Sequence, residues 1–240
     1  MHIVLGRWTQ DRLNNLMHEA SDVTDSGERI KFLSRFFLGV DYKGTTLIGD
    51  EDSPEFFVIN LDKVDCFTFI DYIEAMRISV SFPEFKENLQ KVRYREGKIA
   101  FENRNHFFTD WIEFNSHLIT DVTGQVSDQR AESITKTLNL KENGSLFING
   151  IQPRERKFSY IPSDALDEKV LSNLKTGDYA GIYSKFQGLD VSHVGIVIKE
   201  GNNIYIRHAC SDKKHRKVLD QDINKYMANK PGLVVLRPKP

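Results

Sequence analysis

A cysteine and two histidines stand in an order that could perform nucleophilic acyl transfer. Cys66 lies near the start of a helix-like segment, VDCFTFIDYIEAMRISV, and His193 and His208 fall in two strand-like segments near the C-terminus. A thiolate nucleophile needs a base beside it, and that base needs a polar group that fixes its ring. Together the three residues therefore favour a thiol hydrolase.

The residues after Cys66 have the periodicity of a helix over residues 65–80. Apolar side chains recur there at three- and four-residue steps, at Phe69, Ile70, Ile73, Met76 and Val80. Cys66 precedes Phe69 by three residues, so its thiol is expected to face whatever the helix packs on. The N–H groups and the dipole at a helix start favour a thiolate. A buried cysteine that acts as a small apolar side chain is the alternative interpretation.

The two histidines lie in a predicted β-hairpin over residues 191–209, with its turn at residues 201–203. A tight turn of even length places Gly195 opposite His208, and His193 then lies diagonal to His208 on the same face. A slip of one residue would send the two side chains to opposite faces. Two histidines on an apolar hairpin are structural, metal-binding or catalytic, and the presence of Cys66 favours catalysis.

The elements that must position these residues run from helices to strands. Four helices are predicted, over residues 9–20, 28–38, 65–80 and 84–92. Thr9 opens the first of them, and Asp25 and Glu28 stand in capping-box spacing at the second. Strands are predicted at 56–60, in short pieces between polar loops over 111–175, and from 178 onward. Helices first and strands last predict an α+β fold with an antiparallel sheet.

Composition excludes several classes of protein. The 240 residues hold 33 basic and 34 acidic side chains, so there is no basic excess for binding nucleic acid. The apolar stretch 191–198 is far shorter than the roughly 20 residues that span a bilayer. Two cysteines cannot form a disulfide framework. We expect one domain over residues 1–240, and a monomer.

Several segments between residues 37 and 198 resemble the N-acetylmuramoyl-L-alanine amidase-like branch of the NlpC-type cell-wall hydrolases, which are papain-like cysteine enzymes of bacteria. They are FLGVDYKG, NLDKVDCFTFIDYI, VRYREGKIAFENRNHFFTDW, SYIP and SHVGIVI. The resemblance implies a papain-like fold whose catalytic helix packs on the antiparallel sheet. Residues 1–40 would be a helical embellishment, and residues 81–175 would be inserted loops and short elements that line the cleft.

The resemblance also implies a role for each site residue. Cys66 is the nucleophile, His193 the general base and acid, and His208 the group that orients His193. Tyr42 matches a tyrosine that reaches the cleft beside the nucleophile, and Asp65 matches an acidic residue that helps to hold a substrate amine. No metal or cofactor is implied, and the expected partner is peptidoglycan or a muropeptide.

One departure from the family pattern bears on which bond is cut. Phe67 and Thr68 follow the cysteine where the usual peptidase motif has Ser-Gly. Part of the pocket for a free L-Ala-γ-D-Glu end is then missing. This favours the N-acetylmuramoyl–L-alanine bond, with a γ-D-glutamyl–diamino acid endopeptidase as the alternative. Such a substrate implies the periplasm or cell envelope, with a signal peptide removed before residue 1; a cytoplasmic protein is the alternative.

The stretch RNHFFTDW at 104–111 is expected to form a wall of the substrate cleft. Arg104 would pair with a substrate carboxylate, Trp111 would stack on a sugar or peptide, and Asn105 and His106 would contribute polar contacts. The alternatives are a polar loop whose groups are satisfied within the protein, and His106 as the catalytic base.

Two other classes of function remain open at this point. Cys66, His193 and His208 could form a Cys-His₂ zinc site of a hydrolase, although no closely spaced ligand pair supports it. A non-catalytic cell-wall binding module would be expected to have lost the cysteine or the base. Cys210 is expected to be inert, and the KKHRK run at 213–217 to be a solvated loop.

Overall fold

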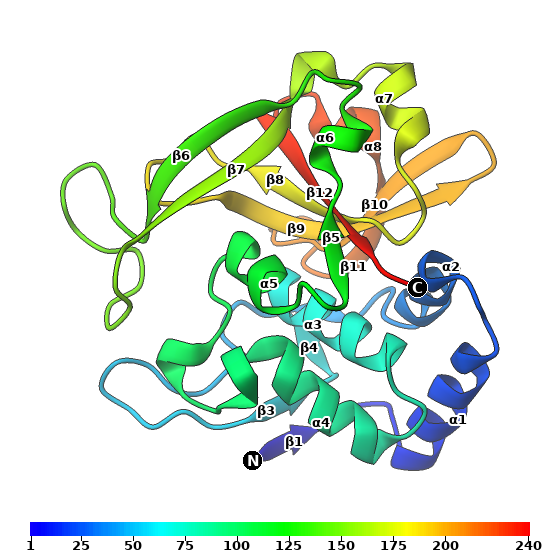
Figure 1. Cartoon of the computed structure of the whole chain (residues 1–240). Helices are drawn as coiled ribbons and strands as arrows, with labels where there is room; N and C mark the ends of the chain where they lie inside the picture. Colours follow the sequence, from blue (N-terminus) through cyan, green and yellow to red (C-terminus); the bar gives the residue numbers. More distant parts are fainter. The chain divides into compact units, whose positions relative to one another are not determined.

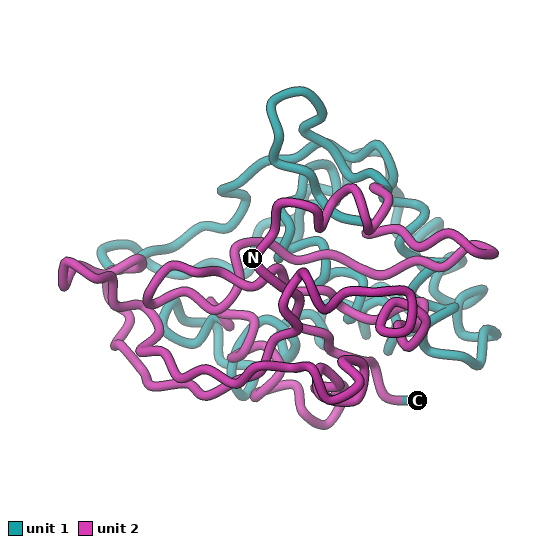
Figure 2. The backbone as a smooth tube through the Cα atoms, turned by 90° about the horizontal axis from the view of Figure 1, so that it is seen from above, with its two compact units in different colours: residues 1–104, 207–220, 240 teal, residues 105–206, 221–239 magenta.

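Helices dominate the first half of the chain and an antiparallel sheet the second half in the computed structural model, which describes all 240 residues (Figure 1). This order confirms the α+β class. The chain divides into unit 1, residues 1–104, 207–220 and 240, and unit 2, residues 105–206 and 221–239 (Figure 2). The chain passes from unit 2 to unit 1 within strand β10 (Asn203–Ala209) and returns to unit 2 within strand β11 (Val218–Asp222). The single catalytic domain stays a prediction.

The helices of unit 1 begin where their capping residues predict. They are α1 (Gln10–Ser21), α2 (Ser26–Arg35), α3 (Cys66–Arg77) and α4 (Phe82–Arg93). Thr9 caps α1 and Asp25 caps α2, each accepting a hydrogen bond from the backbone N–H three residues on. The second helix ends at Arg35, three residues before the predicted end. The fourth starts earlier than predicted because Ser81 caps it and Pro83 is tolerated in its first turn.

Helix α3 is buried on all sides rather than along one stripe. Every residue from Thr68 to Arg77 is buried, and its acidic and basic members are paired. Glu74 bonds Arg77 at 2.7 Å, and Asp71 bonds Arg93 of α4 at 2.9 Å. The predicted place of Val80 in the stripe is wrong, because the helix ends at Arg77 and Val80 is 45 % exposed. The pairing of these charged side chains allows a helix that carries them to be enclosed on all sides.

Two pairs of short parallel strands complete unit 1. Strand β1 (His2–Val4) pairs with β3 (Val58–Asn60), and β2 (Asp41–Tyr42) pairs with β4 (Lys63–Val64). Strand β4 leads through Asp65 directly into α3. The short 3₁₀ turns η1 (Arg95–Gly97) and η2 (Phe101–Asn103) follow α4. The register of β2 with β4 is what places Tyr42 near the start of α3.

The large sheet has the strand order β11-β10-β9-β8-β12-β7-β6, with β5 paired to the end of β12. Its other strands are β5 (Ile119–Asp121), β6 (Glu132–Leu138), β7 (Arg154–Pro162), β8 (Tyr179–Tyr183), β9 (Val191–Glu200) and β12 (Gly232–Pro238). The last strand enters between β8 and β7, antiparallel to both. A β-carbon at Gly232 would lie 2.6 Å from the Ile161 carbonyl oxygen, so this entry requires glycine.

Helices cover both faces of this sheet within unit 2. On one face lie α6 (Thr123–Val126), α7 (Glu168–Asn173) and α8 (Ile223–Met227), with a 3₁₀ turn η3 (Ser163–Ala165) before α7. Their apolar side chains pack on Ala180, Ile182, Val197 and Val235. On the other face α5 (Phe108–Phe114) brings Phe108 against Gly181, where a β-carbon would lie 2.6 Å from the ring. The prediction of short strands between polar loops from residue 111 onward is wrong for residues 111–114, which are helical.

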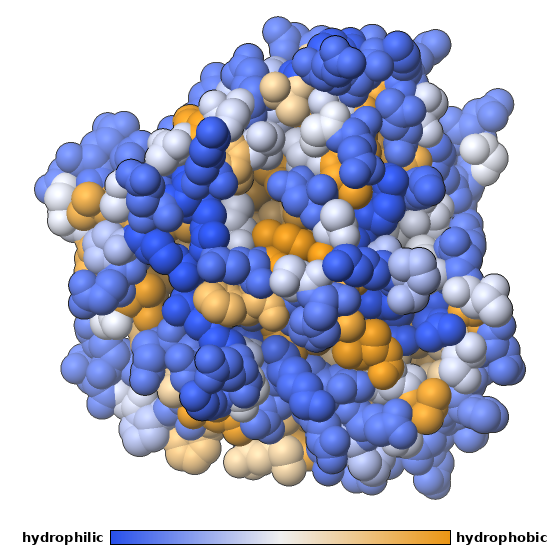
Figure 3. Space-filling view, in the orientation of Figure 1, coloured by the Kyte–Doolittle hydropathy of each residue, from blue (hydrophilic) through white to orange (hydrophobic).

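On the face that Figure 3 shows, hydrophilic residues predominate and apolar residues form small separate areas. The most exposed large apolar side chain is Phe186, in the loop between β8 and β9. None of the helices combines the length and the apolar character needed to cross a bilayer.

Candidate active site

Cys66 is the first residue of α3, and its neighbours lock the start of that helix. Asp65 Oδ1 accepts hydrogen bonds from the backbone N–H of Phe67 (3.0 Å), the backbone N–H of Thr68 (2.7 Å) and the Thr68 hydroxyl (2.9 Å). The Thr68 hydroxyl in turn accepts from the Asp65 N–H at 3.0 Å, which completes a capping box. The half-buried Cys66 side chain therefore leaves the backbone at a well-determined position where the helix dipole favours a thiolate.

Tyr42 lies beside this helix start, as the register of the small strands requires. Tyr42 is opposite Val64, and the Lys43 N–H donates to the Val64 carbonyl at 2.9 Å. Partial burial raises the pKa of the Tyr42 phenol, and the negative charges of Cys66 and Asp65 raise it further. The phenol is therefore a hydrogen-bond donor at neutral pH. The structure brings Tyr42, Asp65 and Cys66 together within unit 1.

A fourth residue of this group, Arg216, was missed in the sequence. Its guanidinium carbon lies 4.9 Å from the centre of the Tyr42 ring, and its Nη2 donates to the Tyr42 carbonyl at 3.3 Å. The positive charge of Arg216 lowers the pKa of Tyr42 and so opposes the rise in that pKa that burial causes. Residues 211–217 are exposed, which confirms the solvated loop. No spacing rule connects position 216 with position 42, so only the fold could reveal the contact.

The titration of Tyr42 tests this arrangement. We expect Cys66→Ala to bring the pKa of Tyr42 part of the way back toward 10.0, because it removes one of two negative charges and leaves the burial unchanged. Arg216→Gln is expected to raise that pKa. Because the folded-state pKa is raised, the stability that Tyr42 contributes is complete below pH 10.0 and is lost as the pH rises through the folded-state pKa. Carbon-13 NMR of ring-labelled tyrosine measures the pKa, and identical values in all three proteins would contradict the arrangement.

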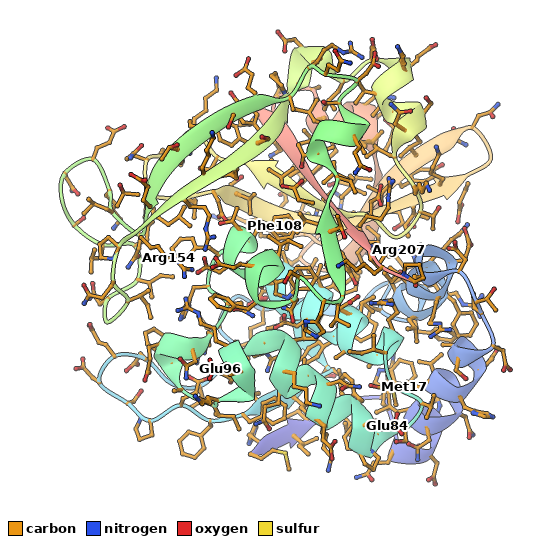
Figure 4. The ribbon with its side chains drawn as sticks, in the orientation of Figure 1. Met17, Glu84, Glu96, Phe108, Arg154 and Arg207 are labelled. Carbon is orange, nitrogen blue, oxygen red and sulfur yellow. The ribbon has the colours of Figure 1, made fainter.

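His208 lies in the part of β10 that belongs to unit 1, and it is 2 % exposed. The preceding residue, Arg207, anchors the strand. It bonds both carboxylate oxygens of Asp220 at 2.7 Å and donates to the Ser34 hydroxyl at 3.0 Å, beside α2 (Figure 4). A bidentate pair of this kind gives a strand a definite position. The backbone at His208 is therefore fixed.

His193 lies in β9, in unit 2, and is half-buried. It is paired with Ile182 of β8, and an irregularity in the register follows immediately between Ile182 and Tyr183. Bulges of this kind turn a side chain away from its regular direction and are common beside active sites. The strands β9 and β10 are separated only by Gly201 and Asn202, an even-membered turn.

Two buried charged side chains hold the chain just before His193. Lys136 Nζ donates to the carbonyls of Ser184, Phe186 (3.0 Å) and Leu189 (2.9 Å). Asp190 accepts from the Thr109 N–H at 2.7 Å and the Thr109 hydroxyl at 2.9 Å, in the first turn of α5. Burial lowers the pKa of Lys136 and raises that of Asp190. These contacts fix the loop that leads into β9.

The expected roles of two residues in the 104–111 stretch are wrong. Arg104 donates from Nε to Glu55 at 2.8 Å and from Nη2 to the Gly49 carbonyl at 3.0 Å, so its carboxylate partner is in the protein. Trp111 is fully buried, stacks on Phe108 and meets Tyr179 edge-on, so its ring cannot reach a sugar. Asn105 is buried and His106 half-buried, and their contacts with substrate stay predictions.

The two cysteines are not joined in a disulfide, and Cys210 is buried. No group of three or more histidine, cysteine, aspartate or glutamate side chains is arranged to hold a metal ion.

The chain matches one described family and several solved structures. The N-acetylmuramoyl-L-alanine amidase-like family matches residues 32–233. Two crystal structures of an N-acetylmuramoyl-L-alanine amidase from Bacteroides uniformis are 28% and 29% identical, with TM-scores of 0.73 and 0.75. Each match covers 90% of this chain and 99% of theirs.

The crystal structure of a protein from Legionella pneumophila is 21% identical in sequence and has a TM-score of 0.81, so the two proteins share the fold. The match covers 96% of this chain and 94% of the Legionella chain. No curated protein matches the chain. Because the family match spans residues 32–233, most of the sequence, this protein belongs to the N-acetylmuramoyl-L-alanine amidase-like family.

Proposed function

We propose that this protein is a thiol amidase that cleaves the N-acetylmuramoyl–L-alanine bond of peptidoglycan fragments. Family membership and the two Bacteroides uniformis amidases support the substrate class. The observation that carries the thiol chemistry is Cys66 at the capped start of α3, with Tyr42 and Asp65 beside it. The substrate implies a periplasmic or envelope setting.

In the proposed mechanism, Cys66 Sγ attacks the lactyl carbonyl carbon and the carbon–nitrogen bond to L-alanine breaks. His193 gives its proton to the leaving amine, and the backbone N–H of Cys66 contributes to an oxyanion hole. Water then attacks the thioester with His193 as the base, which releases the thiol and the lactyl carboxylate. His208 orients the His193 ring. The even-membered turn between β9 and β10 is consistent with the predicted register of the two histidines.

The contacts of Thr68 favour the muramoyl bond over the γ-D-glutamyl bond. A peptidase that recognises a free peptide N-terminus needs acceptors beside its nucleophile. Here the Thr68 hydroxyl donates to Asp65 Oδ1 and accepts from the Asp65 N–H, so the capping box uses its donor and one of its two acceptor lone pairs. These hydrogen bonds all go to Asp65 Oδ1, and we assign the other carboxylate oxygen, Oδ2, to an N–H donor of the substrate under either assignment of the bond.

Mass spectrometry of a digest tests the proposal. The substrate is N-acetylmuramoyl-L-Ala-γ-D-Glu-diaminopimelate, and the expected products are N-acetylmuramic acid and the intact peptide. Release of diaminopimelate with L-Ala-γ-D-Glu left on the sugar would instead show an endopeptidase. Binding without any product would show a non-catalytic module, and activity that a chelator abolishes would show a metal hydrolase.

A further inference from the structure

Arg216 is held in place by the backbone around it. The segment 210–218 is bonded at both ends, by Cys210 N–H to the Lys217 carbonyl (3.0 Å) and by Val218 N–H to the Val40 carbonyl (2.8 Å). The Tyr42 N–H donates to the Arg216 carbonyl itself at 2.8 Å. Within the loop, the Arg216 N–H donates to the Asp212 carbonyl at 3.0 Å. The position of Arg216 over Tyr42 therefore follows from the fold, although the loop is exposed.

The backbone conformation at Arg216 is also unusual. Its φ is 43°, in the left-handed region that residues with a side chain rarely adopt. Nothing about a solvated loop requires an arginine there, since glycine or asparagine would adopt this conformation more easily. A conformation of this kind persists only where the surrounding structure determines it, as the hydrogen bonds of the 210–218 segment do here.

The guanidinium of Arg216 keeps most of its hydrogen-bonding capacity. Its one hydrogen bond within the protein goes from Nη2 to a carbonyl at 3.3 Å, and stacking on Tyr42 uses only its face. Arg104 and Arg207, by contrast, each bond a carboxylate through two nitrogens. A guanidinium has five N–H donors in a planar fork that matches a carboxylate. The charge and edge of Arg216 thus remain available to an anion.

The rest of the loop adds positive charge around Arg216. Lys213, Lys214 and Lys217 are exposed on the same loop, whereas Asp212 is its only acidic residue. The Asp212 carboxylate accepts the Lys214 N–H at 3.0 Å. The whole chain has a net charge of −1, so this basic concentration is local. Arg216, within this basic loop, lies over Tyr42, and Tyr42 is near Cys66 at the start of α3.

We propose that Arg216 is a specificity-determining residue that binds the first free carboxylate of the substrate's peptide beyond the amide attacked by Cys66. The inference rests on the proposed function. In a muropeptide the γ-linked D-glutamate carries a free α-carboxylate one residue beyond L-alanine, and in an amidated muropeptide that group is a neutral carboxamide. Arg216 then makes the enzyme prefer the acid over the amide.

A pair of muropeptides that differ only in this group tests the inference. Each is titrated calorimetrically into Cys66→Ala protein, which needs no turnover: N-acetylmuramoyl-L-Ala-γ-D-Glu-diaminopimelate, and the same compound with the D-glutamate α-carboxamide. The acid is expected to bind about tenfold more tightly, as for a charge-assisted bidentate contact. Adding Arg216→Gln is expected to remove this difference, and Arg216→Lys to keep part of it. High salt should reduce it as well.

Lys214→Gln is the matched control, because it removes one positive charge from the same loop without touching Tyr42. It should leave the preference for the acid nearly unchanged. If Arg216→Gln weakens both ligands equally, Arg216 only positions Tyr42 and the inference is overturned. Equal binding of acid and amide to protein that retains Arg216 also overturns it, even where the wild-type enzyme cleaves both. Failure of the wild-type enzyme to cleave either compound refutes the proposed function, which the digest measures separately.

Discussion

Cys66→Ala is expected to lower muropeptide hydrolysis at least about a thousandfold while leaving the fold intact. The thiol is the only group that can form the acyl intermediate in the proposed mechanism, so no slower route through the same site remains. The substitution is structurally mild because Cys66 is half-buried and the capping box is made by Asp65 and Thr68. The rate is measured by the release of N-acetylmuramic acid, and the fold by circular dichroism. His193→Ala should cause a loss of similar size.

Cys210→Ala is the matched control, since it removes the other thiol from the same unit. Its activity should stay near that of the wild type. In the wild-type protein, iodoacetamide at pH 6 should modify Cys66 before the buried Cys210, because a thiolate at a helix start is more reactive than a buried thiol. Full activity of Cys66→Ala would contradict the thiol mechanism.

Lys136→Met is expected to reduce the free energy of unfolding by about 1 to 3 kcal/mol. Methionine has nearly the same length and packs in the same space, but it cannot donate to the three carbonyls of Ser184, Phe186 and Leu189. Lys136 is 2 % exposed, so water cannot easily replace the lost donor. The loop that leads to His193 would loosen, and hydrolysis should fall as well.

Lys157→Met provides the comparison for this effect. Lys157 lies on the neighbouring strand β7, opposite Thr135, and its side chain is exposed. The same chemical change there should alter the free energy of unfolding by less than about 0.5 kcal/mol. Urea denaturation followed by circular dichroism measures both variants. Equal stability of the two would show that Lys136 is not needed to hold the 184–189 loop.

Local signals predicted the elements that carry the candidate nucleophile. Thr9 and Asp25 mark helix starts because a capping side chain bonds an N–H only three residues away. Cys66 could be placed in the first turn of a helix because the apolar residues after it recur at three- and four-residue steps, and the order of helices and strands led to the α+β class. These inferences depend on interactions within one or two turns of chain, which sequence patterns report directly.

Contacts between distant segments were decided only by the tertiary structure. Arg104 looked available for a substrate carboxylate until the fold brought Glu55 to it, and Trp111 looked available for stacking until α5 buried it against Tyr179. Burial depends on what packs from elsewhere in the chain, which no periodicity within residues 104–111 encodes.

The residues around Cys66 also differ in whether the sequence could predict their place. Asp65 and Cys66 are neighbours in the chain, so their joint position at a helix start could be predicted. Arg216 is 174 residues from Tyr42, and its contact depends on the bridge between Asp41 and Lys217 together with the register of β2 and β4. Strand pairing sets that register through hydrogen bonds between backbones, which are nearly independent of side-chain identity. The sequence alone therefore predicted the candidate nucleophile and determined its helix, and only the tertiary structure decided which positive charge lies beside Tyr42.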